Sequence, residues 1–154
     1  MDNFESHSLR GAIDAGALSD FCAEFERLEP LASGSLDDPV SPGELRLQLD
    51  DGIGEATTAT LTVRWSVQAD YNVHYTDDTR RNLRWDVHPH EYTAPDGDEH
   101  YHPPPNASGG DNDVAASCIG VTELVLVARA VHQLWRAGYD GGSVDPLNDA
   151  INPP

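Results

Sequence analysis

The feature that most constrains the fold is a run of four segments in which apolar and polar residues alternate. The segments span residues 44–50, 60–68, 72–76 and 82–88 of the 154-residue chain. A period of two is typical of a β-strand with one buried and one polar face. Four such strands in succession favour an antiparallel sheet that is covered on its apolar side only.

The last two of these segments form a hairpin if the connecting loop has an odd number of residues, because Tyr75 and Leu83 then share a face. This register places His74 opposite Arg84, whereas a slip by two residues places it opposite Asp86. In either register, one face of the sheet gathers basic and titratable side chains. These are Arg64, His74, Arg84, Asp86 and His88.

Two helical patterns flank the strands. Between residues 18 and 28, apolar residues recur every three or four positions until Pro30 stops the pattern. A broader apolar stripe runs from Val121 to Trp135, with Thr122 as the expected cap and Gly138 as the expected end. We expect this second helix to cover the apolar face of the sheet.

These patterns predict three segments and one fold class. Residues 1–43 form a helical arm with a linker at 32–43, residues 44–138 form the main domain, and residues 139–154 form a tail. The prolines after His88 exclude a central strand there. We therefore predict an α+β fold with a four- to five-stranded antiparallel sheet, a C-terminal helix packed on one face and an appended N-terminal helix.

Charge sets the conditions under which the chain folds. Its 27 acidic and 9 basic residues give a net charge of −18, and every basic residue is arginine. This charge repels itself unless salt screens it, and the Debye length falls to about 3 Å near 1 M salt. We expect a halophilic protein with an acidic surface; an acidic mesophilic protein is the alternative.

The chain shows no sign of export or membrane insertion. No basic and apolar leader precedes Leu9, and no apolar run is long enough to cross a bilayer. Its two cysteines form no disulfide framework. We expect a cytoplasmic protein with no membrane partner.

Residues 74–102 concentrate the groups that could carry chemistry, including five of the seven histidines. A solvated polar face explains them without any function. His88-x-His90 and His100-x-His102 could instead hold zinc, nickel or copper. A third interpretation is cleavage of RNA by acid–base chemistry, in which arginine holds phosphate and histidine moves protons without a metal or other cofactor.

The same stretch resembles the TumE-type toxins of small toxin–antitoxin pairs. The resemblance lies in residues 71–78 (YNVHYTDD), 83–86 (LRWD), 88–90 (HPH) and 100–102 (HYH), within a span from Leu45 to Gly138. Tyr101 and Pro103 stand where the family carries a lysine, and an adjacent histidine pair is reduced to His90 alone. The matching positions are Tyr75, Arg84, Asp86, His90, His100 and His102.

This resemblance implies a toxin that acts on RNA and is silenced by an antitoxin with a helix-turn-helix DNA-binding fold. Arg84 is then expected to bind phosphate and Asp86 to orient its neighbours. Proton transfer falls to His88, His90 or His102. The expected substrate-binding residues are Arg64, His74, Tyr75, Arg81 and His100.

Two other functions remain as alternatives. The chain could be a non-catalytic interaction protein whose N-terminal helix or sheet edge binds a partner or forms a homodimer. It could also be a metal-binding module, in which zinc or nickel is lost when His100 and His102 are changed.

Overall fold

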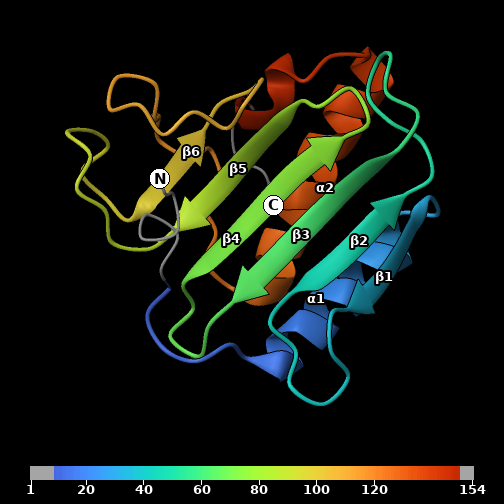
Figure 1. Cartoon of the computed structure of the whole chain (residues 1–154), viewed down its shortest axis with the longest axis horizontal. Coiled ribbons are helices and arrows are strands. Elements are labelled where there is room, and N and C mark those ends of the chain that lie inside the picture. The colour runs from blue at the N-terminus through green and yellow to red at the C-terminus, as the bar shows by residue number, and fades with distance from the viewer. Residues whose placement is uncertain (1–8, 150–154) are drawn as a thin grey trace.

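A computed structural model describes residues 9–149 (Figure 1). The expected absence of a leader concerns residues 1–8, which lie outside this range, as do the last five residues of the expected tail. Along the chain the elements are α1 (Ala15–Leu28), β1 (Ala32–Leu36), β2 (Leu45–Leu49), β3 (Ala59–Trp65), β4 (Tyr71–Asp77), β5 (Asn82–Val87), β6 (Glu99–His102), α2 (Leu124–Gly141) and the 3-10 helix η2 (Asp145–Asn148).

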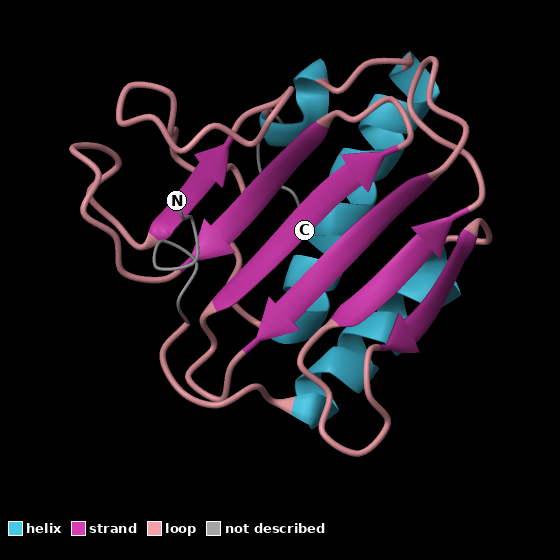
Figure 2. Cartoon of the chain, viewed as in Figure 1, coloured by secondary structure: helices cyan, strands magenta, loops and turns pink. Residues whose placement is uncertain are grey.

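The strands form one antiparallel sheet in the order β1-β2-β3-β4-β5-β6, so each strand pairs with its neighbour in sequence. Figure 2 shows the sheet as one layer with both helices behind it. The predicted α+β class is confirmed. The predicted strand number of four to five is too low, because the described residues form six strands.

The first missed strand is β1, which occupies the start of the expected linker 32–43. Its sequence, ASGSL, lacks the apolar alternation that marks the other strands. Backbone pairing with β2 holds it at the edge, where Gly34 lies opposite Leu47. A Cβ at Gly34 would collide with the Cys22 sulfur of α1, so glycine allows the helix to approach closely.

The second missed strand is β6, which lies in the proline-rich stretch after His88. Pro95 precedes it and Pro103 follows it directly, so the prolines bound the strand without interrupting it. It pairs with β5 and forms the other edge of the sheet. The exclusion of a central strand agrees with this position, but regular structure does not stop at His88.

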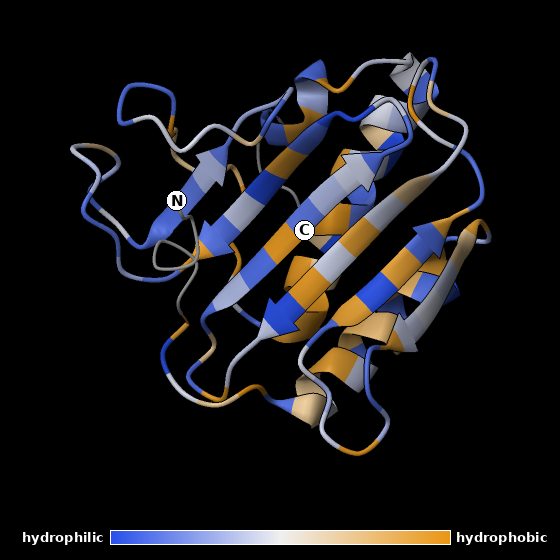
Figure 3. Ribbon diagram, viewed as in Figure 1, coloured by the Kyte–Doolittle hydropathy of each residue, from blue (hydrophilic) through white to orange (hydrophobic). Residues whose placement is uncertain are grey.

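The apolar face of the sheet packs against both helices to form one core (Figure 3). Phe21 and Phe25 of α1, Leu47 of β2 and Leu134 of α2 are fully buried in it. Each such side chain stabilises the fold by about 1.5–3 kcal/mol. The N-terminal helix therefore shares the core of the sheet and α2. None of the helices in residues 9–149 is long and apolar enough to cross a membrane.

Both ends of α2 differ from expectation. The cap residue is Glu123 and not Thr122, and the Glu123 side chain makes no capping hydrogen bond in the described structure. Gly138 lies inside the helix, where a Cβ would collide with Leu147. The helix ends instead before Gly142, which adopts the left-handed conformation at φ 72°.

Candidate functional site

The register of β4, β5 and β6 builds two rows of side chains across the polar face. Tyr75 pairs with Leu83, so the first of the two predicted registers is confirmed. One row is therefore His74–Arg84–His102, and the other is Asn72–Asp86–His100. Residues from three strands meet here because each strand presents alternate residues to the same face.

The Asp86 carboxylate is the centre of this arrangement. Its Oδ1 accepts a hydrogen bond from Asn72 Nδ2 at 2.9 Å, and Arg84 Nε donates to both Oδ1 and Oδ2 at 2.8 Å. Its Oδ2 faces three imidazole Nε2 atoms, those of His88 at 3.3 Å, His100 at 3.5 Å and His102 at 3.1 Å. We call Arg84, Asp86, His88, His100 and His102 the Asp86 cluster; each is at most 5% exposed.

The three imidazoles of the cluster are oriented in the same way, each with Nδ1 against a backbone carbonyl. A carbonyl oxygen can only accept, so each Nδ1 carries the proton and each Nε2 points at the carboxylate. Among the described residues, the Nε2 atoms of His100 and His102 have no hydrogen-bond partner. The Nδ1 distances are 2.9 Å for His88 to Pro89, 2.8 Å for His100 to Asp98 and 2.9 Å for His102 to Ser108.

Burial and charge act against each other on the titratable groups. Burial alone would raise the pKa of Asp86, but the surrounding imidazoles and Arg84 hold it well below its usual value. Burial would lower the pKa of His88, yet its contact with Asp86 raises it. Burial dominates at His74, whose pKa is lowered.

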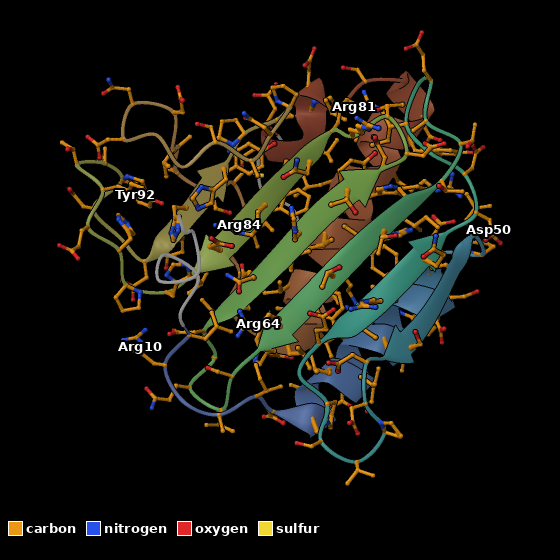
Figure 4. The ribbon with its side chains drawn as sticks, viewed as in Figure 1. Arg10, Asp50, Arg64, Arg81, Arg84 and Tyr92 are labelled. Carbon is orange, nitrogen blue, oxygen red and sulfur yellow. The ribbon has the colours of Figure 1, made fainter. Side chains whose placement is uncertain are left out.

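A second layer covers the cluster on the β6 side. His90 and Tyr92 lie on the segment between β5 and β6, and their rings pack on His100 with centroid distances of 4.7 and 5.8 Å. His90 Nε2 donates to the Gly97 carbonyl at 2.7 Å, and its Nδ1 accepts from Tyr92 N at 3.0 Å. His90 is thus near the cluster, but both of its nitrogens are engaged. Sequence reasoning did not single out Tyr92, which is labelled in Figure 4.

The polar face is more open on the β3–β4 side of the cluster. Arg64 and His74 are both partly exposed there, and Figure 4 shows Arg64 and Arg84 on the same side of the sheet. Arg64 Nη1 donates to Asn72 Oδ1 at 3.3 Å, which links it to Asp86 through one amide. These two predicted substrate-binding residues therefore border the cluster.

Two predicted substrate-binding residues lie elsewhere. Tyr75 faces the apolar core, as its pairing with Leu83 requires, and its hydroxyl donates to Asp77 at 2.7 Å. Arg81 Nε also binds Asp77, at 3.1 Å, and Nη2 donates to the Ile53 carbonyl at 2.7 Å. Figure 4 shows Arg81 at the β4–β5 turn, apart from Arg84. Both residues hold that turn and are not part of the Asp86 cluster.

One cavity of the described structure lies apart from the cluster. It has a volume of about 570 Å³, and Asp70, Tyr71, Val87 and Ile119 are among its lining residues. Its lining includes none of the Asp86 cluster. We therefore base the candidate site on the convergent polar groups and not on cavity size.

The cluster unites a guanidinium, an ionised carboxylate and three imidazoles, a set suited to binding phosphate, moving protons or holding a metal ion. A family model described as Toxin TumE matches residues 22–137. The match covers more than half of the chain and the whole cluster, so the chain belongs to the TumE toxin family. It starts within α1, earlier than Leu45. Searches of curated proteins and of solved structures gave no match.

Proposed function

We propose that this TumE-family chain is the toxin of a two-gene pair and that it cleaves RNA by acid–base chemistry at the Asp86 cluster. The observation that carries the proposal is the row His74–Arg84–His102, which sets a guanidinium between two imidazoles on one sheet face. A third imidazole, His88, contacts the same carboxylate as Arg84.

Arg84 is the phosphate-binding residue of this proposal. A guanidinium offers a planar fork that fits phosphate oxygens and stabilises the charge that develops on them during cleavage. Asp86 fixes the orientation of Arg84 through Nε at 2.8 Å. Arg64, on the open side, supplies a second positive charge for the RNA backbone.

Proton transfer is assigned to His74 and His88. The lowered pKa of His74 keeps its imidazole neutral near pH 7, so it can take the proton of a ribose 2′-hydroxyl. The 2′-oxygen then attacks phosphorus, the bond to the 5′-oxygen breaks, and His88 donates a proton to that leaving oxygen. His102, which lies opposite Arg84 with its Nε2 3.1 Å from Asp86, completes the row that holds the phosphate. His90 packs on His100, and no step uses a metal.

High salt resolves the conflict between this substrate and the charge of the chain. A net charge of −18 repels RNA, whose binding depends on neutralising phosphates. In molar salt the repulsion is screened within about 3 Å, and short-range contacts decide binding. We therefore place the protein in a salt-rich cytoplasm, with a helix-turn-helix antitoxin as its silencing partner.

Growth of a salt-adapted host after induction tests the proposal. Loss of a charge-stabilising donor costs about 10²–10³ in rate, so Arg84→Ala should abolish the growth arrest that the wild type causes. Arg46→Ala is the matched control, because Arg46 is an exposed arginine of β2 that pairs with Glu44, far from Asp86 in the sheet order. Arrest by a folded Arg84→Ala protein at the wild-type level would contradict the proposed site.

A further inference from the structure

Two nitrogen atoms of the Asp86 cluster have an unusual environment. The Nε2 atoms of His100 and His102 are buried, and neither has a hydrogen-bond partner among residues 9–149. Buried polar side-chain atoms are nearly always paired, so an exception requires an explanation. Their Nδ1 atoms donate to backbone carbonyls. A ring flip would break these hydrogen bonds, so it does not give the buried Nε2 atoms a partner.

Neither protonation state of these rings satisfies the site by itself. If both rings are neutral with the proton on Nδ1, each Nε2 carries a lone pair, and two hydrogen-bond acceptors face the acceptor oxygens of Asp86. If both rings are instead protonated on Nε2, they add two positive charges beside Arg84. The single Asp86 carboxylate then has to offset all three positive charges. A metal ion at their meeting point accepts lone pairs from both nitrogens and from the carboxylate together.

We propose that Asp86, His100 and His102 bind one divalent transition-metal ion of the zinc type. One ligand atom from each residue lies within 4.8 Å of the others. Bonds of about 2.0–2.1 Å set tetrahedral zinc ligands about 3.3 Å apart. The distances from Asp86 Oδ2 to Nε2 are 3.5 Å for His100 and 3.1 Å for His102, which bracket that spacing.

The outer contacts of these ligands have the form that metal sites require. Each ligating imidazole donates its Nδ1 proton to a backbone carbonyl, which fixes Nε2 toward the ion. Asn72 donates to Oδ1, and Arg84 Nε lies 2.8 Å from both Oδ1 and Oδ2, so these two donors fix the carboxylate with Oδ2 toward the imidazole nitrogens. The ligands are thus oriented before any ion binds.

The other histidines near the cluster are not in this ligand set. Both nitrogens of His90 are engaged, with the Gly97 carbonyl and with Tyr92 N. His88 Nε2 forms a hydrogen bond with Asp86 Oδ2 at 3.3 Å, which leaves it to the proton transfer assigned to it. Three protein ligands leave a fourth position for water or a phosphate oxygen. The proposed ion site is therefore additional to the proposed RNA cleavage and does not depend on it.

Titration of the full-length protein with Zn²⁺ tests this inference. The chain is stripped with a chelator, dialysed into molar NaCl and titrated in a calorimeter, and Co²⁺ absorption reports the coordination geometry. We expect one ion per chain. His100→Asn and His102→Asn should each weaken binding by more than about 100-fold, because loss of a ligand exceeds the 10–100-fold cost of losing an outer contact.

These variants keep a side-chain amide donor near the Nδ1 position and lose only Nε2. His132→Gln is the control and should bind Zn²⁺ as the wild type does, because His132 contacts Glu29 instead. Absence of one-to-one binding by the wild type would overturn the inference, as would unchanged binding by the double variant. If the variants do not fold, one equivalent of Zn²⁺ must still raise the melting temperature of the wild type, and no shift overturns the inference. Purified protein is used throughout, so a failed growth experiment leaves this result unaffected.

Discussion

Glu29 and Asp86 are both fully buried carboxylates with an arginine and histidine beside them, but their surroundings differ. Glu29 accepts from Leu31 N at 3.0 Å and meets Arg136 Nε at 2.9 Å and His132 Nε2 at 3.2 Å. Every one of these neighbours is a donor. Asp86 accepts from Asn72 and Arg84, but its Oδ2 also faces two imidazole nitrogens that have no hydrogen-bond partner among residues 9–149.

From this contrast we infer that the Glu29 network is structural and that the Asp86 cluster is the functional one. The Glu29 network joins the end of α1 to α2, and its polar atoms satisfy one another within the fold. The Asp86 cluster leaves bonding capacity unused in a buried place, which lowers stability. Unused capacity is retained where a ligand, substrate or ion supplies the missing partner. This difference, and not burial or charge alone, is why we propose Asp86 as the centre of the site.

Breaking the structural network should have the largest effect on stability. Removing one partner of a buried ion pair costs about 3–5 kcal/mol, and the partial exposure of Arg136 reduces this to about 3 kcal/mol for Glu29→Gln. Denaturant unfolding in molar salt measures it, with wild-type growth arrest expected from the molecules that still fold. A loss below about 1 kcal/mol would show that Glu29 does not hold the two helices together.

Sequence alternation predicted the centre of the sheet because burial alternates with it. In β2 the pattern LRLQL becomes alternately buried and exposed, and in β3 the apolar residues are the buried ones. The same alternation placed His74 and Arg84 on one face. It also places Tyr75 in the core, so the family resemblance, and not the pattern, suggested a role for Tyr75 at the site.

The two edge strands and the assembly of the cluster depended on long-range contacts, which local sequence patterns do not specify. Strand β1 has no apolar period, and the packing of Gly34 on α1 that allows it is long-range. Strand β6 did carry a signal, since His100 and His102 flank Tyr101 with a period of two, and Tyr101 is buried on the other face. The convergence of both histidines on Asp86 required the β5–β6 pairing, which no local motif specifies.

A third buried carboxylate, Asp70, links an ion network to the pH dependence of stability. Burial would raise its pKa, but hydrogen bonds from Arg10 N, Nε and Nη2 at 2.8–2.9 Å lower it. A lowered folded-state pKa contributes stability above the unfolded value of about 3.9, and this stability is lost as the pH falls through the folded pKa.

Arg10→Ala should therefore raise the pH at which acid unfolds the protein and lower its stability at pH 7, by less than Glu29→Gln does because Arg10 is half exposed. Acid titration followed by circular dichroism measures both effects. Arg46→Ala is the control, because Arg46 is an exposed arginine that pairs with the partly exposed Glu44. An unchanged acid midpoint would mean that Asp70 is stabilised by other contacts.

Of these variants, His102→Asn should have the smallest effect on stability and the largest effect on function. His102→Asn keeps a donor for the Ser108 carbonyl and removes only an Nε2 with no hydrogen-bond partner in the described part of the chain, so it should cost less than about 1 kcal/mol. His132→Gln makes the corresponding change in the structural network, with a donor kept for Glu29. The two variants differ in which carboxylate they affect.

Host growth after induction of these two variants at equal levels of folded protein is the most direct test of the central claim. If the Asp86 cluster makes the protein a toxin, His102→Asn permits normal growth while His132→Gln arrests growth as the wild type does. Arrest by His102→Asn at the wild-type level would contradict the claim. The claim would also be contradicted if folded His132→Gln were the one variant that failed to arrest growth, because the active residues would then lie with Glu29.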